Sequence, residues 1–392
     1  MRRTALVWDD VLARYRFSAE HPLDPRRLEL TVGLIRKLGL VGDDARPVVA
    51  PRIATDEEIQ LAHDPAYIEA VKRASEPGAA TSGYERFGLG TEDVPIVEGM
   101  HEAGALIVGA TLTAAELVMT GRVTRAFSIA GGLHHARRAE AAGFCIYNDL
   151  AVAIRWMQRE HRVRVLYVDV DAHHGDGVQW IFYDDPDVLK VSLHESGAYL
   201  FPGTGFVDEV GEGEGYGFTV NVPLDAHTED DSFLQSFRDV VPEVAAAFRP
   251  DVLVMQCGCD AHVLDPLTHL RCTTAMYEEV MRLAGEVADE HCEGRIIATG
   301  GGGYAIHAVV PRAWALVWAG LCGVKAPDSL PNEWCKSVRL ESGRDVPCTL
   351  RDPADAFPPA PRREEIRAIN EKTVSAVRHR VLPLITGWGL AF

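Results

Sequence analysis

The chain has 392 residues, 47% of them hydrophobic and 24% charged, so it can bury the core of a large folded protein. Its formal net charge of −18 at pH 7 argues against nucleic acid or an anionic membrane as a partner. The eight cysteines lack zinc-finger spacing, and the apolar run after Arg3 is too short for a secretion signal, so we expect reduced thiols and a cytoplasmic location.

Helix-like and strand-like segments alternate along most of the chain. Helix-like patterns lie near residues 25–38, 56–74, 96–120, 148–161, 231–248 and 273–291. Apolar, strand-like runs lie near residues 126–130, 164–170, 188–193, 218–222, 252–257 and 295–299. This alternation predicts an α/β fold, a single three-layer α/β/α domain around a mostly parallel sheet. The most apolar long stretch, Ala103 to Met119, contains Glu116 and threonines, which favour a buried helix over a membrane span.

Three polar residues follow the apolar segment 163–168. Asp169, Asp171 and His173 are spaced two apart, and side chains two apart on a strand share a face. Because α/β sheets bind ligands beyond the carboxyl ends of their strands, this spacing predicts a metal or catalytic site. The alternative for this segment alone is a solvated acidic loop after a core strand.

Two further apolar runs end in residues of the same kind. Residues 128–132 lead through two glycines into His134 and His135, and residues 251–259 lead to Asp260, which could also cap a helix. A catalytic zinc keeps three protein ligands and one open position. Asp171, His173 and Asp260 fit that requirement and leave the two histidines free for proton transfer. Nearby acids that could orient and charge-stabilise these histidines are Asp169 and Asp176.

The last strand-like run ends in four glycines followed by Tyr304. The segment lacks the Lys-Ser/Thr that a phosphate-binding P-loop needs. Glycines allow the backbone to approach a ligand closely and to adopt positive φ angles. The hydroxyl of Tyr304 could then donate to a developing oxyanion, the alternative being an ordinary packed aromatic residue.

With these motifs the chain resembles the zinc-dependent histone deacetylase family, which has the arginase/deacetylase fold. The similarity runs from His21 to about residue 325. The matching motifs occur in family order: Gly131-Gly-Leu-His-His135, Gly143-Phe-Cys-Ile-Tyr-Asn-Asp149, Asp169-Val-Asp-Ala-His-His-Gly-Asp176, Val191-Ser-Leu-His194, Phe201-Pro-Gly-Thr-Gly205, Cys257-Gly-Cys-Asp260 and Gly300-Gly-Gly-Gly-Tyr304. The segment Asp260-Ala-His-Val-Leu-Asp-Pro-Leu-Thr-His-Leu270 is similar to the bacterial acetoin-utilisation (AcuC-type) deacetylases.

The resemblance assigns a role to each candidate residue. It implies zinc ligands at Asp171, His173 and Asp260, proton transfer by His134 (paired with Asp169) and His135 (paired with Asp176), and carbonyl polarisation by Tyr304. It also implies a substrate channel. Phe144 and Phe201 would wall it, the backbone of Gly143 would accept the substrate amide, Asp93 would be the rim acid, Arg27 would lie in an inner cavity beneath the metal, and Leu270 would lie at the mouth.

The function implied by the resemblance is removal of acetyl, or other acyl, groups from lysine side chains of proteins such as acetyl-CoA synthetase. The ligand set would also accept Fe²⁺ or Co²⁺ in place of Zn²⁺, and a monovalent cation such as K⁺ is implied near Asp169 and Ser192.

An acetylpolyamine amidohydrolase is the nearest alternative, disfavoured because Leu270 offers no charge to a second ammonium group. An arginase-like binuclear enzyme would need a carboxylate where Gly258 stands. A catalytically silent acyl-lysine binding protein could have lost some of these groups, and none is missing.

The motifs extend from residue 27 to residue 304 yet must meet at one metal, which argues against two domains. We therefore expect a catalytic domain over residues 1–325. Residues 326–361 are rich in proline, and 364–380 form an amphipathic segment. We expect this part, residues 326–392, to pack on the same domain. The sequence does not indicate an oligomeric state.

Overall fold

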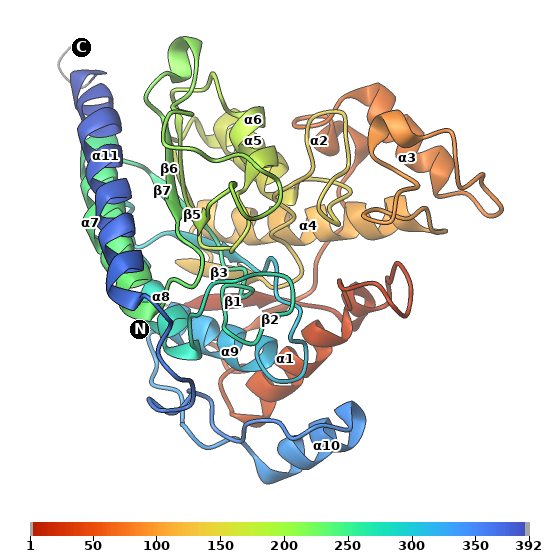
Figure 1. The fold of residues 1–392 in the computed structure, drawn as a ribbon. Coiled ribbons are helices and arrows are strands. Elements are labelled where there is room, and N and C mark those ends of the chain that lie inside the picture. Colours follow the sequence, from red (N-terminus) through yellow and green to blue (C-terminus); the bar gives the residue numbers. More distant parts are fainter. Residues whose placement is uncertain (1–2, 389–392) are drawn as a thin grey trace.

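The computed structural model describes residues 3–388, so the outermost residues of the predicted ranges 1–325 and 326–392 lie outside it. The described residues form one eight-stranded sheet in the order β2-β1-β3-β8-β7-β4-β5-β6 (Figure 1). The strands are β1 (Thr4–Val7), β2 (Val48–Val49), β3 (Arg125–Ser128), β4 (Val165–Asp169), β5 (Val188–Glu195), β6 (Thr219–Leu224), β7 (Val252–Gln256) and β8 (Ile296–Thr299). Every neighbouring pair is parallel, which confirms the predicted parallel sheet.

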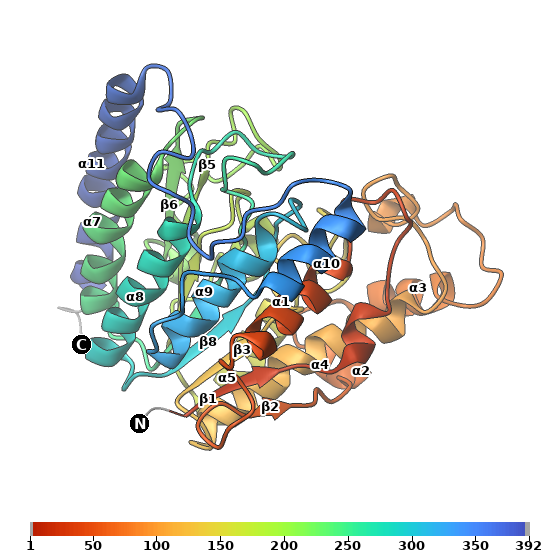
Figure 2. The same ribbon diagram turned by 90° about the horizontal axis from the view of Figure 1, so that it is seen from below.

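Helices cover both faces of this sheet (Figure 2). On one face α4 (Met100–Met119) packs on β1, β3 and β8 and on α5 (Asp149–His161). On the other, α1 (Arg26–Lys37), α9 (Val310–Cys322), α8 (Thr274–His291) and α7 (Asp230–Phe248) pack in a row. The helix α11 (Arg363–Trp388) lies against α7 and the edge strand β6. The remaining α-helices are α2 (Asp56–Ile59), α3 (Pro65–Ala74), α6 (Asp176–Ile181) and α10 (Asn332–Ser342), and 3-10 turns span Asp10–Ala13, Glu85–Phe87 and Gly213–Gly215.

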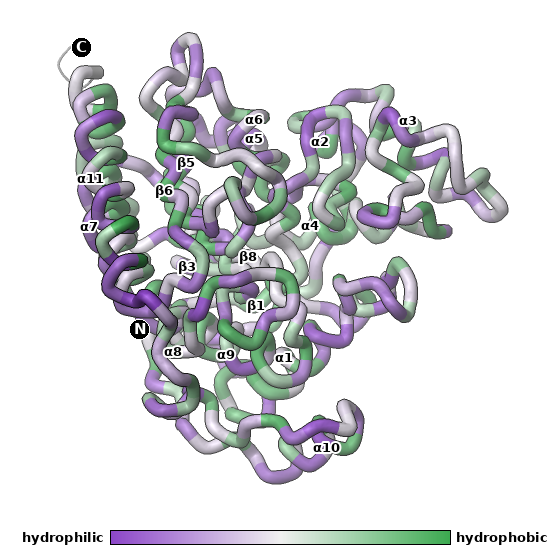
Figure 3. The backbone as a smooth tube through the Cα atoms, in the orientation of Figure 1, coloured by the Kyte–Doolittle hydropathy of each residue, from purple (hydrophilic) through white to green (hydrophobic). Residues whose placement is uncertain are grey.

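The hydrophobic residues gather where the layers meet. All residues of β3, β4, β5, β7 and β8 are buried, as expected for parallel strands covered on both faces. Figure 3 shows hydrophobic and hydrophilic residues alternating along α7 and α11, the pattern of helices with one face on the core. By length and composition α4 could cross a membrane, but 67% of its most apolar window is buried inside the protein, so it is a core helix as predicted.

The structure corrects several of the predicted elements. The helix-like stretch 56–74 is two helices, because Asp64 is extended and Pro65 begins α3, where its missing N–H costs nothing. The strands β1 and β2 and the helix α9 were not predicted. The helix α10 forms within the Pro-rich segment 326–361, and α11 contains the amphipathic segment 364–380.

Buried polar contacts attach the C-terminal segment to the body of the protein. Asp352 accepts hydrogen bonds from Arg312 Nη1 (2.7 Å) and from the backbone N–H of Thr274 (2.9 Å), and its Oδ2 lies 2.9 Å from His262 Nε2. Burial alone would raise the pKa of Asp352, but His262 and Arg312 outweigh it and lower the pKa to about 2. On α11, Asn370 donates to the hydroxyl groups of Thr228 (2.7 Å) and Ser232 (2.9 Å).

Candidate metal centre and active site

Four neighbouring strands bring the predicted site residues together. In the sheet β3, β8, β7 and β4 lie side by side, and Ser128, Thr299, Gln256 and Asp169 are in register at their carboxyl ends. The chain leaving each strand carries one part of the site. These parts are His134 and His135 after β3, Tyr304 after β8, Asp260 after β7, and Asp171 and His173 after β4.

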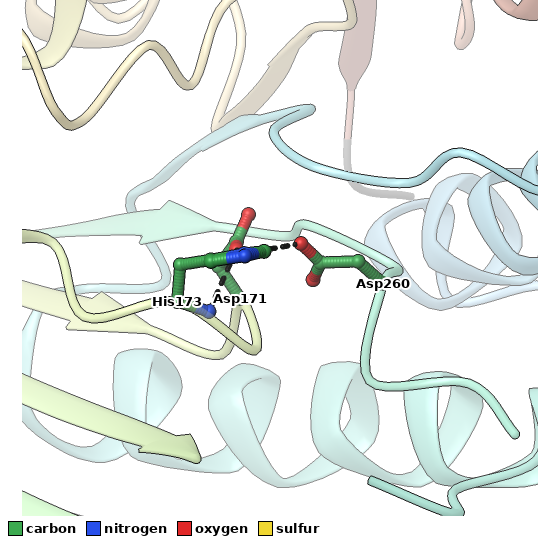
Figure 4. A group of neighbouring side chains, drawn as sticks. All are labelled: Asp171, His173 and Asp260. Atoms are coloured by element: carbon green, nitrogen blue, oxygen red, sulfur yellow. Dashed lines mark hydrogen bonds and ion pairs between the residues drawn. The ribbon is translucent and has the colours of Figure 1, made fainter. Parts of the chain in front are cut away.

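Asp171, His173 and Asp260 form the candidate metal centre (Figure 4). Each offers one ligand atom, and these atoms all lie within 4.8 Å of one another. His173 Nδ1 is 2.9 Å from Asp260 Oδ2 and 3.2 Å from Asp171 Oδ1. All three side chains are buried, so they are placed to share one ion rather than to interact with solvent.

The charges at this centre fit a divalent cation. Burial and the negative charge of Asp171 raise the pKa of Asp260 to about 7. Burial alone would lower the pKa of His173, but its hydrogen bonds to the carboxylates of Asp171 and Asp260 raise it to about 10. Without an ion, protonated His173 supplies positive charge beside the two acids, and a bound cation would take over that role; oxygen and nitrogen ligands of these types suit zinc.

Two His–Asp pairs lie beside the metal centre. His134 Nδ1 lies 2.8 Å from Asp169 Oδ2, and His135 Nδ1 lies 2.8 Å from Asp176 Oδ1. The Nε2 atoms of the two histidines lie 3.0 Å from each other. The structure thus brings together the two pairs that the resemblance implied.

The surroundings shift the pKa values of these two histidines in opposite directions. Burial would lower the pKa of His134, but the charges of Asp169 and Asp171 raise it to about 9. Burial and the nearby charge of His134 lower the pKa of His135 to about 4. Without a bound ion, a proton shared by the pair therefore resides on His134 rather than on His135.

The glycine run makes close backbone contact with the metal centre, as predicted. The backbone N–H of Gly302 donates to Asp171 Oδ2 at 2.7 Å. A Cβ atom at this glycine would lie only 2.2 Å from Asp260 Oδ2, so no other residue fits there. Gly303 has a φ of +136°, which favours glycine, and it leads directly into Tyr304.

The two predicted channel phenylalanines border different parts of the site. Phe144 packs edge-on against Tyr304, with ring centroids 5.8 Å apart. Phe201 packs edge-on against His135 at 5.1 Å and near His173 at 6.5 Å, and it is 49% exposed. This arrangement is compatible with two walls of a channel that leads to the metal centre.

Asp93 and Gly143 are directly bonded to each other. Asp93 Oδ2 accepts the backbone N–H of Gly143 at 2.7 Å. A Cβ atom at Gly143 would lie 2.1 Å from the ring of His135, so the loop before Phe144 passes close to the proposed acid–base pair. One oxygen of Asp93 therefore supports this loop.

Arg27 is buried beneath the glycine loop. Its Nη1 donates to the carbonyl oxygen of Gly303 at 3.0 Å, and its guanidinium lies 5.0 Å from the ring of Trp314. It also lines an apolar cavity together with Tyr15 and Phe144. The structure thus places Arg27 next to an internal cavity, as the resemblance implied.

The expectation for Leu270 is wrong. This residue is buried in the hydrophobic core, with 2% exposure, and therefore does not lie at the mouth. The chain turns inward here because the backbone of Cys272 pairs with that of His262 in an isolated parallel β-bridge. Leu264 is the exposed apolar residue of the loop, at 44%, and it lines a surface groove that also contacts Tyr304.

Sequence reasoning assigned no role to three buried residues that hold the site in place. Gln256, the last residue of β7, donates to Asp171 Oδ2 at 2.8 Å. Asp149 accepts the backbone N–H groups of Gly132 and Leu133, which precede the two histidines. Tyr167 donates to Asp169. All three belong to or adjoin the motifs quoted above, but nothing in those motifs shows which atoms they reach.

Comparison with known proteins agrees with this geometry. The Histone deacetylase domain family matches residues 21–321. The acetoin utilization protein AcuC of Bacillus subtilis is 48% identical over 381 residues, covering 97% of this chain and 98% of that protein. AcuC of Staphylococcus xylosus is 41% identical, covering 95% and 97%.

Solved structures show the same relationship. The crystal structure of an HDAC homolog from Aquifex aeolicus superposes with a TM-score of 0.84 at 31% identity, covering 95% of this chain and all of that one. The crystal structure of an HDAC homolog complexed with SAHA superposes with a TM-score of 0.83, at the same identity and coverage. The family fold implies a catalytic metal, and the buried Asp-His-Asp cluster is the site in this chain that could hold it. Matched by the family over most of its length and by relatives over nearly all of it, this chain belongs to the histone deacetylase family.

Proposed function

We propose that the protein is a metal-dependent lysine deacetylase that hydrolyses acetyl-lysine in other proteins. The observation that carries this proposal is the buried cluster of Asp171, His173 and Asp260 beside two His–Asp pairs. Hydrolysis of an amide needs an activated nucleophile, a stabilised oxyanion and an acid for the departing amine. The chain supplies a group for each.

Asp171, His173 and Asp260 would hold a metal that, when bound, would polarise the acyl carbonyl and lower the pKa of the attacking water. His135, held by Asp176, takes the proton from that water and passes it to the amine, whose conjugate acid has a pKa near about 10.4. His134 keeps its proton beside Asp169 and adds positive charge to the site. Tyr304 donates a hydrogen bond to the carbonyl oxygen as negative charge builds there.

The surroundings of the site favour a lysine side chain on a protein. Phe144 and Phe201 offer aromatic surface to the methylene stem, and the carbonyl oxygen of Gly143 offers an acceptor for the substrate amide. Exposed apolar side chains, Phe201 and Leu264, adjoin the site on its outer side. From the likeness to the AcuC relatives, we propose metabolic enzymes such as acetyl-CoA synthetase as substrates, in the cytoplasm.

Acetylpolyamine hydrolysis is the second candidate. The argument from an uncharged Leu270 at the mouth no longer applies, because Leu270 is buried. The exposed apolar side chains of Phe201 and Leu264 favour a peptide, whereas Asp93 and Asp345, which shares a groove with Leu264, are the carboxylates that a second ammonium group could contact. An arginase-like second metal is disfavoured more strongly, because even a Cβ atom at Gly258 would lie 1.9 Å from Asp171 Oδ2.

The identity of the ions is part of the proposal. Zinc fits the two carboxylates and one imidazole, and Fe²⁺ or Co²⁺ would be accepted by the same ligands. A monovalent cation such as K⁺ near Asp169 and Ser192 rests on the resemblance alone. These two residues are in register on neighbouring strands, which is compatible with a shared ion.

A substrate panel tests the proposal. Purified protein reconstituted with Zn²⁺, Fe²⁺ or Co²⁺ is assayed on acetyl-lysine and longer acyl-lysine peptides, acetylpolyamines and arginine. We expect hydrolysis of acetyl-lysine peptides that a hydroxamate chelator inhibits and that His173→Ala abolishes. The matched control His379→Ala changes an exposed histidine on α11 and should keep full activity. Preference for acetylspermidine would favour the second candidate, and binding of acyl-lysine without turnover would favour a silent protein.

A further inference from the structure

The peptide group that carries Tyr304 is held at both ends by buried charged side chains. Its carbonyl oxygen, on Gly303, accepts a hydrogen bond from Arg27 Nη1 at 3.0 Å. Its N–H, on Tyr304, donates to Asp265 Oδ2 at 2.8 Å. Arg27 and Asp265 are only 5% and 7% exposed, so water does not readily replace either contact. The orientation of this peptide plane is therefore set by two side chains of opposite charge.

Asp265 is itself held rigidly in a turn. Its backbone N–H donates to the carbonyl oxygen of His262 at 2.8 Å, and its Oδ1 accepts the backbone N–H of Leu267 at 3.0 Å. The turn follows Asp260 on the same loop after β7. A single loop thus provides both a candidate metal ligand and the acceptor that fixes the backbone of Tyr304.

Upstream of Tyr304 the segment is held by backbone contacts of Gly302, whose N–H donates to Asp171 Oδ2 (2.7 Å) and whose carbonyl oxygen accepts the N–H of Cys259 (2.8 Å). Residues 300–305 form neither helix nor strand, and Gly301 and Gly303 have φ angles of +148° and +136°. Within residues 3–388, the Tyr304 hydroxyl has no hydrogen-bond partner. Its ring contacts Phe144 edge-on, which does not determine where the hydroxyl points. The direction of the side chain therefore depends on how the backbone is held, and Arg27 and Asp265 hold the peptide group that adjoins Tyr304 directly.

We propose that Asp265 is a positioning residue for Tyr304, fixing the Gly303–Tyr304 peptide so that the hydroxyl meets the acyl oxygen at the metal centre. This inference rests on the proposed function, in which Tyr304 polarises the substrate carbonyl. Asp265 touches neither substrate nor metal in this role. It acts through the backbone, and the effect of losing it should appear in the step that uses Tyr304.

A double-mutant comparison tests this role. Asp265→Asn keeps the size of the side chain but replaces one acceptor oxygen by an amide NH₂, which would face a backbone N–H. We expect it to lower kcat about tenfold to hundredfold with KM nearly unchanged, because small misplacement of a reacting group has effects of this size. In a Tyr304→Phe background the same substitution should cause no further loss. The control Asp187→Asn removes an exposed acid that pairs with Arg164 at the opposite, amino-terminal edge of the sheet, and it should leave kcat unchanged.

A second measurement does not depend on activity. Hydrogen exchange followed by mass spectrometry should show faster exchange over residues 301–306 in Asp265→Asn, with the β7 segment and the metal content unchanged. An equal loss of kcat in both backgrounds, a loss of bound metal, or unchanged exchange at residues 301–306 would each overturn the positioning role. If the wild-type protein hydrolyses no acyl-lysine substrate, the proposed function fails instead, and the exchange measurement still decides whether Asp265 anchors the loop.

Discussion

Replacing Asp260 by asparagine should separate metal binding from folding. Asp171 and Asp260 are both buried, and burial together with the charge of Asp171 raises the pKa of Asp260 to about 7. Above that pH, the metal-free protein holds two carboxylates whose charges repel. Asp260→Asn removes one charge and keeps an oxygen for the backbone N–H of Ala172, which now donates to Asp260 Oδ1 at 2.8 Å. The metal-free variant should therefore be at least as stable as the metal-free wild type at pH 8.

Zinc should stabilise the Asp260→Asn variant less than it stabilises the wild type. At a free zinc concentration about 1,000 times its Kd, a bound ion adds about 4 kcal/mol to the free energy of unfolding. If the substitution weakens the site about hundredfold, only about 1.4 kcal/mol remains. An unfolding entropy of about 2.1 cal/mol/K per residue converts these values into Tm increases of about 5 °C for the wild type and about 2 °C for the variant.

Calorimetry with zinc and with chelator measures both Tm values, and elemental analysis gives the bound metal. Asp345→Asn, whose side chain is 89% exposed, serves as the matched control and should respond to zinc like the wild type. A zinc-induced Tm increase in Asp260→Asn equal to that of the wild type would show that Asp260 is not a ligand. The candidate metal centre would then be wrong.

Three further predictions concern catalysis and acid stability. Tyr304→Phe should retain metal and lose about 100-fold to 1,000-fold in kcat, as loss of one oxyanion donor commonly does, and wild-type kinetics would remove Tyr304 from the mechanism. His135→Ala should reduce the rate of deacetylation more than His134→Ala, because His135, held by Asp176, is the residue that is unprotonated at neutral pH and is the proposed base. Equal losses in kcat would contradict that assignment of the general base. Asp352 has a lowered pKa of about 2, so its contribution to stability is complete above about pH 4 and is lost as the pH falls toward 2. Asp352→Asn should lower the free energy of unfolding at pH 7 by about 3 kcal/mol, since it leaves the buried Arg312 unpaired, and should flatten this acid dependence in urea titrations. Parallel pH profiles for variant and wild type would refute that reasoning.

The central strands were predictable from sequence because each is an uninterrupted apolar run buried on both faces. The strands β1 and β2 escaped prediction because they are only four and two residues long, and their pairing partners are distant in sequence. Pro65 marks a helix boundary in the sequence, but the helical pattern on both sides of it led to the prediction of one continuous helix.

The candidate metal ligands and the two histidines beside them were likewise apparent in the sequence. Asp171 and His173 lie just after β4, and His134 and His135 lie in the loop that follows β3. Parallel strands end at one edge of the sheet, so these loops meet there. Leu270 was misplaced because its exposure depends on where the loop turns, and no local pattern indicates that the chain returns to the core there.

The sequence by itself determined which chemical groups this protein brings to one sheet edge, because side-chain type and strand periodicity are local properties. Only the tertiary structure decided how those groups are held and charged. Gln256 reaches Asp171 across 85 positions of sequence, and Asp265 reaches the backbone of Tyr304 across 39. Such contacts depend on the order of strands in the sheet and on the exclusion of water around buried charges. Neither property is present in any short stretch of residues.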